Sequence, residues 1–264
     1  MKISSLLSSS SQIQLHSVLQ IFLGLAVSLF TLRLGAGLFA FRAANRLERP
    51  TYQVIKRLPT AGRSNQFVEI RKYNPYLIAE TTVDESSMRK AGGKGFGKCA
   101  SYIFGENQST TSSNNNKIME KEDSEKMQMT APVRSVGQVS NDSSEKMAMT
   151  SPVRSVGSTT GKKTKISFVI GSKYNLKTVP KPKDKSVKIV KVDEHCLAAV
   201  TFSGPPPSDE RITKERDTIL QTLEKEGIRA KGKETMVYGY HDPIITPNFL
   251  RRNEVAVMVD GKDV

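Results

Sequence analysis

Apolar and polar positions alternate in two parts of the chain, and each part predicts two strands joined by a short turn. In the first part, residues 67–73 alternate as a half-buried strand does, and 76–83 predict a second strand after the turn signal Asn74-Pro75. In the second part, residues 187–191 and 196–202 show the same pattern around a turn. We interpret each part as a β-hairpin.

A helix is predicted after each hairpin. The stretch Phe96 to Phe104 carries apolar side chains at the spacing of one helix face, and Gly105 follows at a position that favours a helix end. Residues 209–226 repeat this arrangement, with Gly227 after the last turn. The apolar stripe of the second helix contains Ile212, Ile219, Leu220 and Leu223.

The two parts also match residue by residue at an offset of 119 positions. The matched pairs are Val68 with Val187, Ile70 with Ile189, Lys72 with Lys191, Ala79 with Ala198, and Thr82 with Thr201. Chance similarity between two amphipathic hairpins is the alternative, but five matches in one register favour duplication. The sequence therefore predicts an α+β fold with two pseudo-symmetric halves.

The N-terminal segment 1–47 differs from the rest and is not expected to belong to the folded core. It is Ser-rich at its start and contains no Asp or Glu, and residues 18–32 are mostly apolar before Arg33 interrupts the run. An acid-free, Ser-rich, Arg-containing leader is typical of an organellar transit peptide. A membrane anchor through residues 18–41 is the alternative, although a charge in mid-membrane costs about 2.5–3.5 kcal/mol, and a secretory signal is a third. Residues 48–65 are interpreted as a linker.

Charge and cysteine content narrow the function only slightly. The formal net charge is +14, and the four basic residues of the leader leave 36 basic against 26 acidic residues, or +10, for the remainder. Such a domain favours anionic partners, although a lysine-rich solvated surface explains the charge equally well. Cys99 and Cys196 show no metal or disulfide spacing and are expected to be small buried side chains.

A short methionine-rich string occurs twice. Residues 125–137 read EKMQMTAPVRSVG and residues 145–157 read EKMAMTSPVRSVG. Strand alternation would place Met127 and Met129 on one side, and Pro132 would end the ladder because it has no N–H to donate. The methionines are interpreted as core or lid residues, or as walls of an adaptable pocket, with metal ligation by the thioethers as a further alternative.

Several of these strings together resemble the SOUL heme-binding family. The KMxMTxPV strings at 126–133 and 146–153 carry the resemblance, as does the closing segment 251–255, which reads RRNEV. Segments in family order lie between them, namely Ser167 to Ile170, Pro180 to Pro182, Ser186 to Ile189, and Phe202 to Gly204. The resemblance covers residues 66–260, with a flexible insertion at about 106–125, and the doubled methionine string is closer to plant and bacterial members than to the short animal ones.

The resemblance implies a distorted antiparallel β-barrel flanked by two α-helices, which binds heme or another tetrapyrrole non-covalently and is not an enzyme. It places the ligand in a groove between the helix 96–104 and the loop 240–250. Apolar walls and a basic rim suit a flat macrocycle with two carboxylates. The implied site residues are Phe96, Lys98, Ala100, Ile103, His241, Ile244, Ile245, Phe249, Arg251 and Arg252.

The axial ligand and the cellular address stay open at this point. His241 is the candidate iron ligand near the implied groove, with Cys99 or a pocket methionine as alternatives. The resemblance also allows a site without a protein ligand, because some family members hold heme without one. His195 is expected in a turn and His16 in the leader. The leader is consistent with a chloroplast protein, and a membrane anchor in another compartment is the alternative.

Four other functions are alternatives to tetrapyrrole binding. Residues 92–99 nearly spell a phosphate-binding loop, but Cys99 stands where a Ser or Thr would hold Mg²⁺. The sequence contains no GxSxG or HExxH motif for a hydrolase. Nucleic-acid binding is not expected, because no basic stripe is interleaved with aromatic residues. A scaffold or interaction role without a heme ligand is the main alternative.

Overall fold

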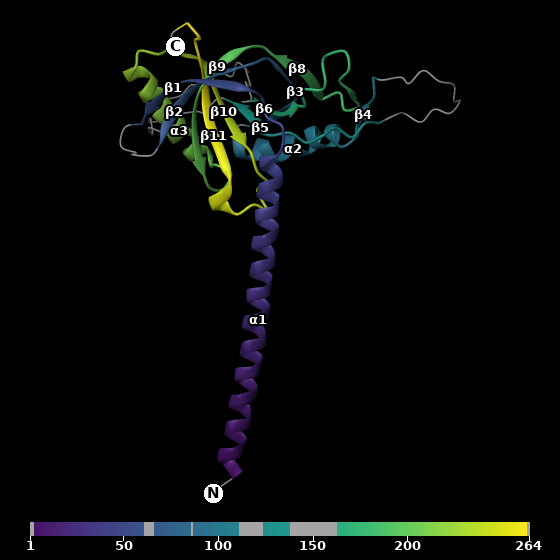
Figure 1. Cartoon of the computed structure of the whole chain (residues 1–264), viewed down its shortest axis with the longest axis vertical. Helices are drawn as coiled ribbons and strands as arrows, with labels where there is room; N and C mark the ends of the chain where they lie inside the picture. The colour runs from purple at the N-terminus through teal and green to yellow at the C-terminus, as the bar shows by residue number, and fades with distance from the viewer. Residues whose placement is uncertain (1–2, 61–65, 86, 111–123, 138–162, 263–264) are drawn as a thin grey trace, which may run out of the picture.

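A computed structural model describes residues 3–60, 66–85, 87–110, 124–137 and 163–262 of the chain. A long N-terminal helix projects from a mixed α/β domain built on a large antiparallel sheet (Figure 1). The elements are α1 (Ile3–Asn45), β1 (Tyr52–Pro59), β2 (Phe67–Tyr73), β3 (Tyr76–Asp84), α2 (Met88–Ile103), β4 (Asn107–Gln108), β5 (Val133–Gly137), β6 (Lys163–Ile170), β7 (Lys181–Pro182), β8 (Val187–Val192), β9 (His195–Ser203), α3 (Asp209–Lys225), β10 (Ala230–Gly239), a 3₁₀ turn η1 (Asn248–Leu250) and β11 (Arg252–Val259).

The strand order of the main sheet is nearly a palindrome. It runs β1-β2-β9-β11-β10-β5-β6-β3-β8. Exchanging β2, β3, β5 and β6 for β8, β9, β10 and β11 reverses the order of these eight strands, and only β1 has no counterpart. This agrees with the two related halves expected from the sequence, and it places the pseudo-twofold axis between β5 and β10.

The two predicted hairpins are wrong. β2 does not pair with β3 but with β9, with Val68 opposite Val200, and β3 pairs with β8, with Ile78 opposite Val190. The chain therefore bends at Asn74-Pro75 and again at Asp193-Glu194, and the two bent segments run antiparallel to each other. The alternation that predicted the strands contains no information on which strands pair, because a bend and a hairpin turn use the same residue types.

The first strand lies inside the stretch that the sequence assigns to a linker. β1 pairs with β2 from Tyr52 opposite Tyr73 to Pro59 opposite Phe67, and its Leu58 is fully buried. The folded domain therefore begins before residue 66. Among the described residues, the pairing series ends at β1 and β8, so a closed barrel is not formed by these hydrogen bonds.

Helices α2 and α3 pack on one face of the sheet. Ile212, Ile219 and Leu223 of α3 contact alternate residues of β2, β9 and β11, and α2 packs mainly on β3 and β6. Both helices begin with a serine cap, because the side chains of Ser87 and Ser208 accept a hydrogen bond from the third following amide. The opposite face of the sheet carries a third cluster that contains Leu197, Ala199, Met236, Tyr238 and Ala256.

The glycine-rich stretch at 92–97 lies within helix α2 rather than in a loop. Gly95 has a packing reason, because a Cβ at this position would be 2.5 Å from Cγ1 of Ile166 on β6. A phosphate-binding loop presents unpaired backbone amides, whereas these residues belong to a continuous helix that begins at Met88. The structure therefore gives no support to the nucleotide-binding alternative.

The first methionine string is described, and the second is not. Met127 is buried against α2 residues and Met129 packs beside it, but residues 124–129 form no strand, and β5 begins after Pro132 instead of ending there. The expected strand ladder across Met127 and Met129 is therefore wrong, although their packing role is confirmed for this copy. Residues 145–157 and most of the insertion 106–125 lie outside the described residues.

Candidate functional site

A cavity opens on the helix-free face of the sheet, where the two halves of the domain meet. Strand alternation directs Tyr73 of β2 and Tyr238 of β10 to this face, together with Tyr240 just after β10. Tyr52 of β1 and Tyr76 of β3 pack beside them. Five tyrosines from different strands therefore surround one space.

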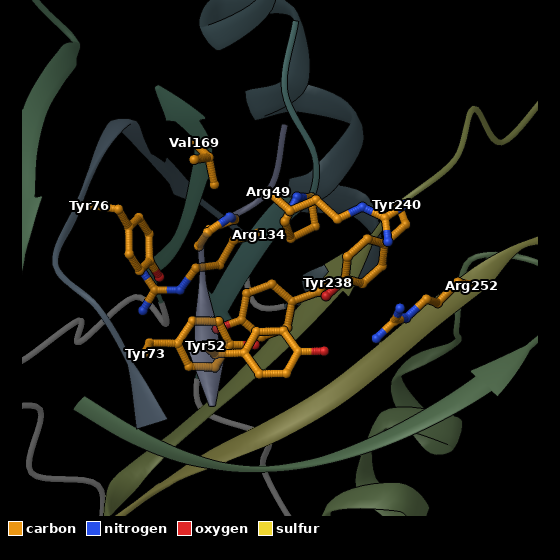
Figure 2. Close-up of a pocket in the computed structure, with 11 residues that line it drawn as sticks. Arg49, Tyr52, Tyr73, Tyr76, Arg134, Val169, Tyr238, Tyr240 and Arg252 are labelled. Carbon is orange, nitrogen blue, oxygen red and sulfur yellow. The ribbon is translucent and has the colours of Figure 1, made fainter. Parts of the chain in front are cut away.

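Three arginines approach the same space, and we call this set of tyrosines and arginines the tyrosine–arginine pocket (Figure 2). It holds a cavity of about 30 Å³ lined by Arg49, Arg134 and Arg252 as well as by the tyrosines. A cavity needs about 10–15 Å³ of such space to hold one water molecule, so the pocket admits only a small polar group.

Two of these arginines retain donors without a partner. The Nε atoms of Arg49 and Arg134 are buried and make no hydrogen bond with the described residues. Arg134 Nη2 contacts the Met236 sulfur at 3.5 Å, and no carboxylate of the described residues forms an ion pair with it. An unpaired buried donor costs free energy, so a carboxylate that entered here would gain hydrogen bonds at little further desolvation cost.

Arg252, by contrast, belongs to a buried ion cluster beneath the pocket. Glu254 is fully buried, and its carboxylate lies 2.6 Å from Arg252 Nη2 and 3.0 Å from Arg71 Nη1. The Tyr240 hydroxyl donates to the same carboxylate at 2.6 Å. Burial alone would raise the pKa of Glu254, but the two guanidinium groups and these hydrogen bonds hold it below its ordinary value.

The ion cluster also fixes the tyrosine rings. The guanidinium carbon of Arg71 lies 4.7 Å from the centroid of the Tyr52 ring, and that of Arg252 lies 4.7 Å from the Tyr240 ring. Burial raises the pKa of Tyr73, Tyr76, Tyr238 and Tyr240, so these phenols stay protonated at neutral pH. The hydroxyls of Tyr240 and Tyr238 already donate to Glu254 and to the Met236 sulfur, so the pocket offers an anionic group chiefly the arginines, among neutral phenols.

A wider groove adjoins this pocket and shares Arg49, Pro50, Tyr76 and Val169 with it. Its volume is about 800 Å³, within the range of sites that hold a cofactor-sized ligand. We call it the groove. Its apolar walls include Leu77, Ile170, Tyr174 and the exposed Leu176, and Lys177 and Lys191 lie on its rim with Arg49.

The residues implied on the first helix lie away from this groove. Ala100 and Ile103 are buried beneath α2, and the exposed Phe96 contacts the Phe168 ring edge-on at 5.1 Å between centroids. Lys98 Nζ lies 3.2 Å from the Ser186 hydroxyl. Cys99 is fully buried, and burial raises the pKa of its thiol to about 12, which does not favour the thiolate that binds iron.

The residues implied on the late loop, residues 240–251, gather at α1 instead. Ile244, Ile245, Phe249 and Arg251 line a cavity of about 250 Å³ together with residues 30–34 of α1. Since α2 packs mainly on β3, β5, β6 and β8, the structure does not join the helix and the late loop into one slot. The single groove implied by the resemblance is therefore divided, because α1 occupies the side of the loop that was assigned to the ligand.

The two histidines of the folded domain differ in tautomer. His241 Nδ1 accepts a hydrogen bond from the Arg252 amide at 3.0 Å, which leaves the proton of the neutral ring on Nε2. An iron ligand needs the opposite arrangement, with Nδ1 as donor and Nε2 free. Burial and nearby arginines lower the pKa of His241, and its ring stacks on Phe41 of α1. The expectation of an axial role for His241 is at odds with this geometry.

His195 was not predicted as a site residue, but it lies beside the tyrosines. Its ring is parallel to that of Tyr73 at 5.3 Å and lies 5.9 Å from Tyr76. Nδ1 faces the Asp193 carbonyl at 2.7 Å and is therefore the donor, so Nε2 carries the free lone pair. Burial lowers the pKa of His195, which favours the neutral ring.

Sequence reasoning named Arg252 but missed the tyrosines, Arg49 and Arg134, for an identifiable reason. Tyr52, Tyr73, Tyr76, Tyr238 and Tyr240 are spread over 189 positions of the chain (240 − 52 + 1) and belong to no local motif. The strands did carry a signal, because Tyr73 and Tyr238 occupy inward-facing strand positions where a packed core would have a purely apolar residue. Only the pairing of β2 with β9, which the hairpin interpretation excluded, brings them together.

Comparison with known proteins finds one matching family and several solved structures of low sequence identity to this chain. The family described as SOUL heme-binding protein matches residues 47–140 and 137–258. No curated protein matches the sequence. Among solved structures, the C-terminal domain of EcmrR is 9% identical with a TM-score of 0.46, covering 74% of this chain and 98% of that one.

Two further solved structures are similarly distant. A hydrolase from Listeria innocua is 10% identical with a TM-score of 0.40, and the match covers 72% of this chain and 91% of that one. SAV2435 bound to tetraphenylphosphonium is 10% identical with a TM-score of 0.38, covering 74% and 95% of the two chains. These likenesses assign no function to the chain.

Proposed function

We propose that this chain, which belongs to the SOUL heme-binding protein family, binds heme or another tetrapyrrole non-covalently in the groove, as a carrier, buffer or sensor and not as an enzyme. The observation that carries the proposal is the apolar groove of about 800 Å³ that continues into a pocket with unpaired arginine donors. The macrocycle would lie against Tyr76, Leu77 and Leu176. Arg49 and Arg134 would bind one carboxylate, and Lys177 or Lys191 the other.

The described residues fit such a ligand in three respects. The groove has the size, its walls combine aromatic with aliphatic side chains, and its rim is cationic. Bound heme would supply an iron centre; His195 is not among the residues that line the groove, but its ring lies 5.9 Å from that of Tyr76, which does line it, and its Nε2 is suited to iron by tautomer and by neutral charge. The plastid address and the plant-type subfamily are also part of this proposal, and they rest on the acid-free, Ser-rich leader.

Porphyrin titration of the full chain in detergent tests the proposal. Hemin and protoporphyrin IX are added to the wild type and to Leu176→Asp, and absorbance and fluorescence are recorded. Leu176 is 59% exposed, so the substitution leaves the core intact while it places a negative charge against the macrocycle and its carboxylates. We expect a saturable one-to-one change in the wild type and about a tenfold weaker affinity in the variant, equal to about 1.4 kcal/mol.

Ile244→Asp is the matched control, because Ile244 is 77% exposed and lies on the late loop. The same change there should leave the affinity unaltered. If Ile244→Asp weakens binding and Leu176→Asp does not, the ligand occupies the late-loop site. If the wild type shows no saturable change, the scaffold alternative replaces the proposal. His195→Gln should shift the Soret band of the hemin complex if His195 is axial.

A further inference from the structure

The late loop displays large apolar side chains that no described residue covers. Ile244 is 77% exposed, Phe249 69% and Ile245 49%. Three such residues within six positions form an apolar patch of the kind that marks an interaction surface. The patch is separate from the groove, since neither of the two sets of lining residues contains a member of the other.

The loop holds these side chains outward by its own hydrogen bonds. Asp242 Oδ1 accepts from the amides of Ile244 and Ile245 at 2.7 and 2.8 Å. Arg251 Nε donates to the Thr246 carbonyl at 2.6 Å. The loop is therefore built to present the patch, and its acidic side chain is engaged with backbone amides.

Helix α1 shows what lies opposite the patch. It is about 65 Å long if its 43 residues rise 1.5 Å each, and it projects from the domain beside the late loop (Figure 1). Residues 20–45 of it are long and apolar enough to cross a membrane, with only 6% of the tested window buried. The side chains of residues 21–32 that face solvent include Phe22, Leu29, Phe30 and Leu32.

Contacts between α1 and the late loop limit which part of the helix can enter a bilayer. A Cβ at Gly37 would be 2.6 Å from Cδ of Pro247, so the helix and the loop touch at this residue. Phe41 stacks on His241 with 5.1 Å between centroids. Residues 37–41 therefore lie beside a folded domain with exposed polar backbone, which cannot enter the hydrocarbon core.

The hydrocarbon-spanning part must then lie before residue 37, and the sequence there has the required length. Residues 13–32 contain no Asp, Glu, Lys or Arg, and 20 residues of helix span about 30 Å; the polar Gln14, His16, Ser17 and Gln20 fall in the first half of this stretch, and residues 21–32 form its apolar part. Arg33 falls at the end of this segment, in the cavity with Ile244 and Phe249. The charge that seemed to interrupt the span is thus placed at its edge, at the level of the patch.

Positive charge at the same level suits lipid headgroups. Arg33 of α1 lies at the patch, Arg42 lies further along the same helix, Arg46 follows its last residue, and no acidic residue precedes Glu48. Basic residues at an anionic membrane surface contribute about 1 kcal/mol each. An apolar patch with a basic surround is typical of segments that lie in the membrane interface.

We propose that the late loop is a second membrane contact: Ile244, Ile245 and Phe249 enter the interface of the anionic bilayer that residues 13–32 of α1 cross, and the domain sits flush on that surface. This inference goes beyond tetrapyrrole binding and does not depend on it. It rests on α1 remaining attached to the domain.

The absence of tryptophan from the sequence gives a direct test. Phe249→Trp introduces a single indole on the patch of the full chain, and Phe104→Trp introduces one at the end of α2, where Phe104 is 56% exposed. Each variant is reconstituted in vesicles of phosphatidylcholine with phosphatidylglycerol, with and without brominated acyl chains. Emission wavelength, quenching and flotation of the protein with the vesicles are recorded.

We expect both variants to float, and only the indole of Phe249→Trp to shift to shorter wavelength and to be quenched by the brominated lipid. Replacing phosphatidylglycerol by phosphatidylcholine should reduce that quenching. Three results would overturn the proposal: a water-exposed, unquenched indole in Phe249→Trp, equal quenching of the two indoles, or failure of the protein to float. The porphyrin titration is independent of all three, so the two proposals can fail separately.

Discussion

The groove and the late loop both combine apolar side chains with arginines, yet they are opposite in shape. In the tyrosine–arginine pocket, into which the groove continues, Arg134 is half-buried among tyrosines and retains an unpaired donor. On the late loop, Ile244 and Phe249 project from the surface and their neighbour Arg251 is already bound to a carbonyl. The concave region suits a ligand that it can surround, whereas the convex region suits a surface that is larger than the domain.

This difference shows why residue type alone does not decide between the two regions. The resemblance implied one ligand groove made of α2 and the late loop, but the late loop contacts α1, and α2 covers the opposite half of the sheet. Both the groove and the late loop have apolar residues with basic neighbours, which is the pattern that the sequence analysis associated with a tetrapyrrole site. Burial and the partner of each arginine distinguish them, and neither can be read from a local motif.

The largest effect is expected beneath the groove, at Glu254. Glu254→Gln removes the negative charge from a fully buried cluster, which leaves Arg252 without its carboxylate partner and Arg71 with Glu69 alone. Breaking a buried pair from one side costs about 3–5 kcal/mol, and we expect a loss of that order in the free energy of unfolding by urea. The late loop should keep its structure until the domain unfolds, because its own hydrogen bonds are unaffected.

Glu69→Gln is the matched control, since Glu69 also contacts Arg71, at 2.8 Å, but its side chain is partly exposed. Since Glu69 is partly solvated and Arg71 keeps its pair with Glu254 in this variant, the loss of stability should be smaller than in Glu254→Gln. Equal losses in the two variants would contradict the structural role given to Glu254.

The same residue predicts a dependence on acidity. The folded-state pKa of Glu254 lies below its ordinary value of 4.5, so its contribution is complete above that pH and is lost as the pH falls through the folded-state pKa. The difference in unfolding free energy between the wild type and Glu254→Gln should therefore be greatest near neutral pH and shrink below pH 4.5. A difference that stays constant into strong acid would show that the charge of Glu254 is not its source.

Much of the fold could be predicted from the sequence, because local periodicity reports it directly. The strand pattern at 67–73 and 196–202, the α3 stripe and the internal offset of 119 all correspond to elements or symmetry of the structure. Strand pairing could not be predicted, because Asn74-Pro75 makes a bend between two sheet regions instead of a hairpin. β1 was missed because Tyr52–Pro59 is mostly exposed and shows no apolar alternation.

The site itself was less accessible to sequence reasoning. His195 was assigned to a turn, and its relation to Tyr73 arises only from the antiparallel register of β2 and β9. Arg134 follows the methionine string, which drew attention to Met127 and Met129 instead. The resemblance implied Ile244, Ile245 and Phe249 as walls of the ligand groove, whereas the structure exposes them beside α1, a segment that was not expected to belong to the folded core.

An intermediate effect is expected at the helix that the sequence had assigned to the ligand. In Gly95→Ala the new Cβ meets Cγ1 of Ile166 at 2.5 Å, so α2 must move away from β6. Overpacking costs about 1–3 kcal/mol, which exceeds the gain in helix propensity of up to about 1 kcal/mol. We expect a net loss of stability by thermal and urea unfolding.

Gly93→Ala provides the comparison within the same helix, because a Cβ there has no neighbour within 4 Å. It should stabilise the protein by up to about 1 kcal/mol. Neither change should move the affinity for porphyrin, since α2 does not line the groove. A large loss of porphyrin affinity in Gly95→Ala, measured at a temperature where the variant is folded, would show that α2 takes part in ligand binding.

The smallest effects are expected on the rim of the groove, at Lys177 and Lys191. Both side chains are exposed, so their attraction to a ligand carboxylate is screened by water and salt. Each substitution by Gln should weaken porphyrin binding by less than about 1 kcal/mol, or up to about fivefold in Kd, at low salt. The loss should shrink as salt is added, because the Debye length falls to about 8 Å at physiological ionic strength.

Lys214→Gln, which removes the same charge from α3 away from the groove, is the control and should leave the affinity unchanged. A salt-independent loss at Lys177 or Lys191 would mean that the lysine stem packs on the macrocycle, and equal losses in all three variants would mean that net charge alone attracts the ligand to the domain.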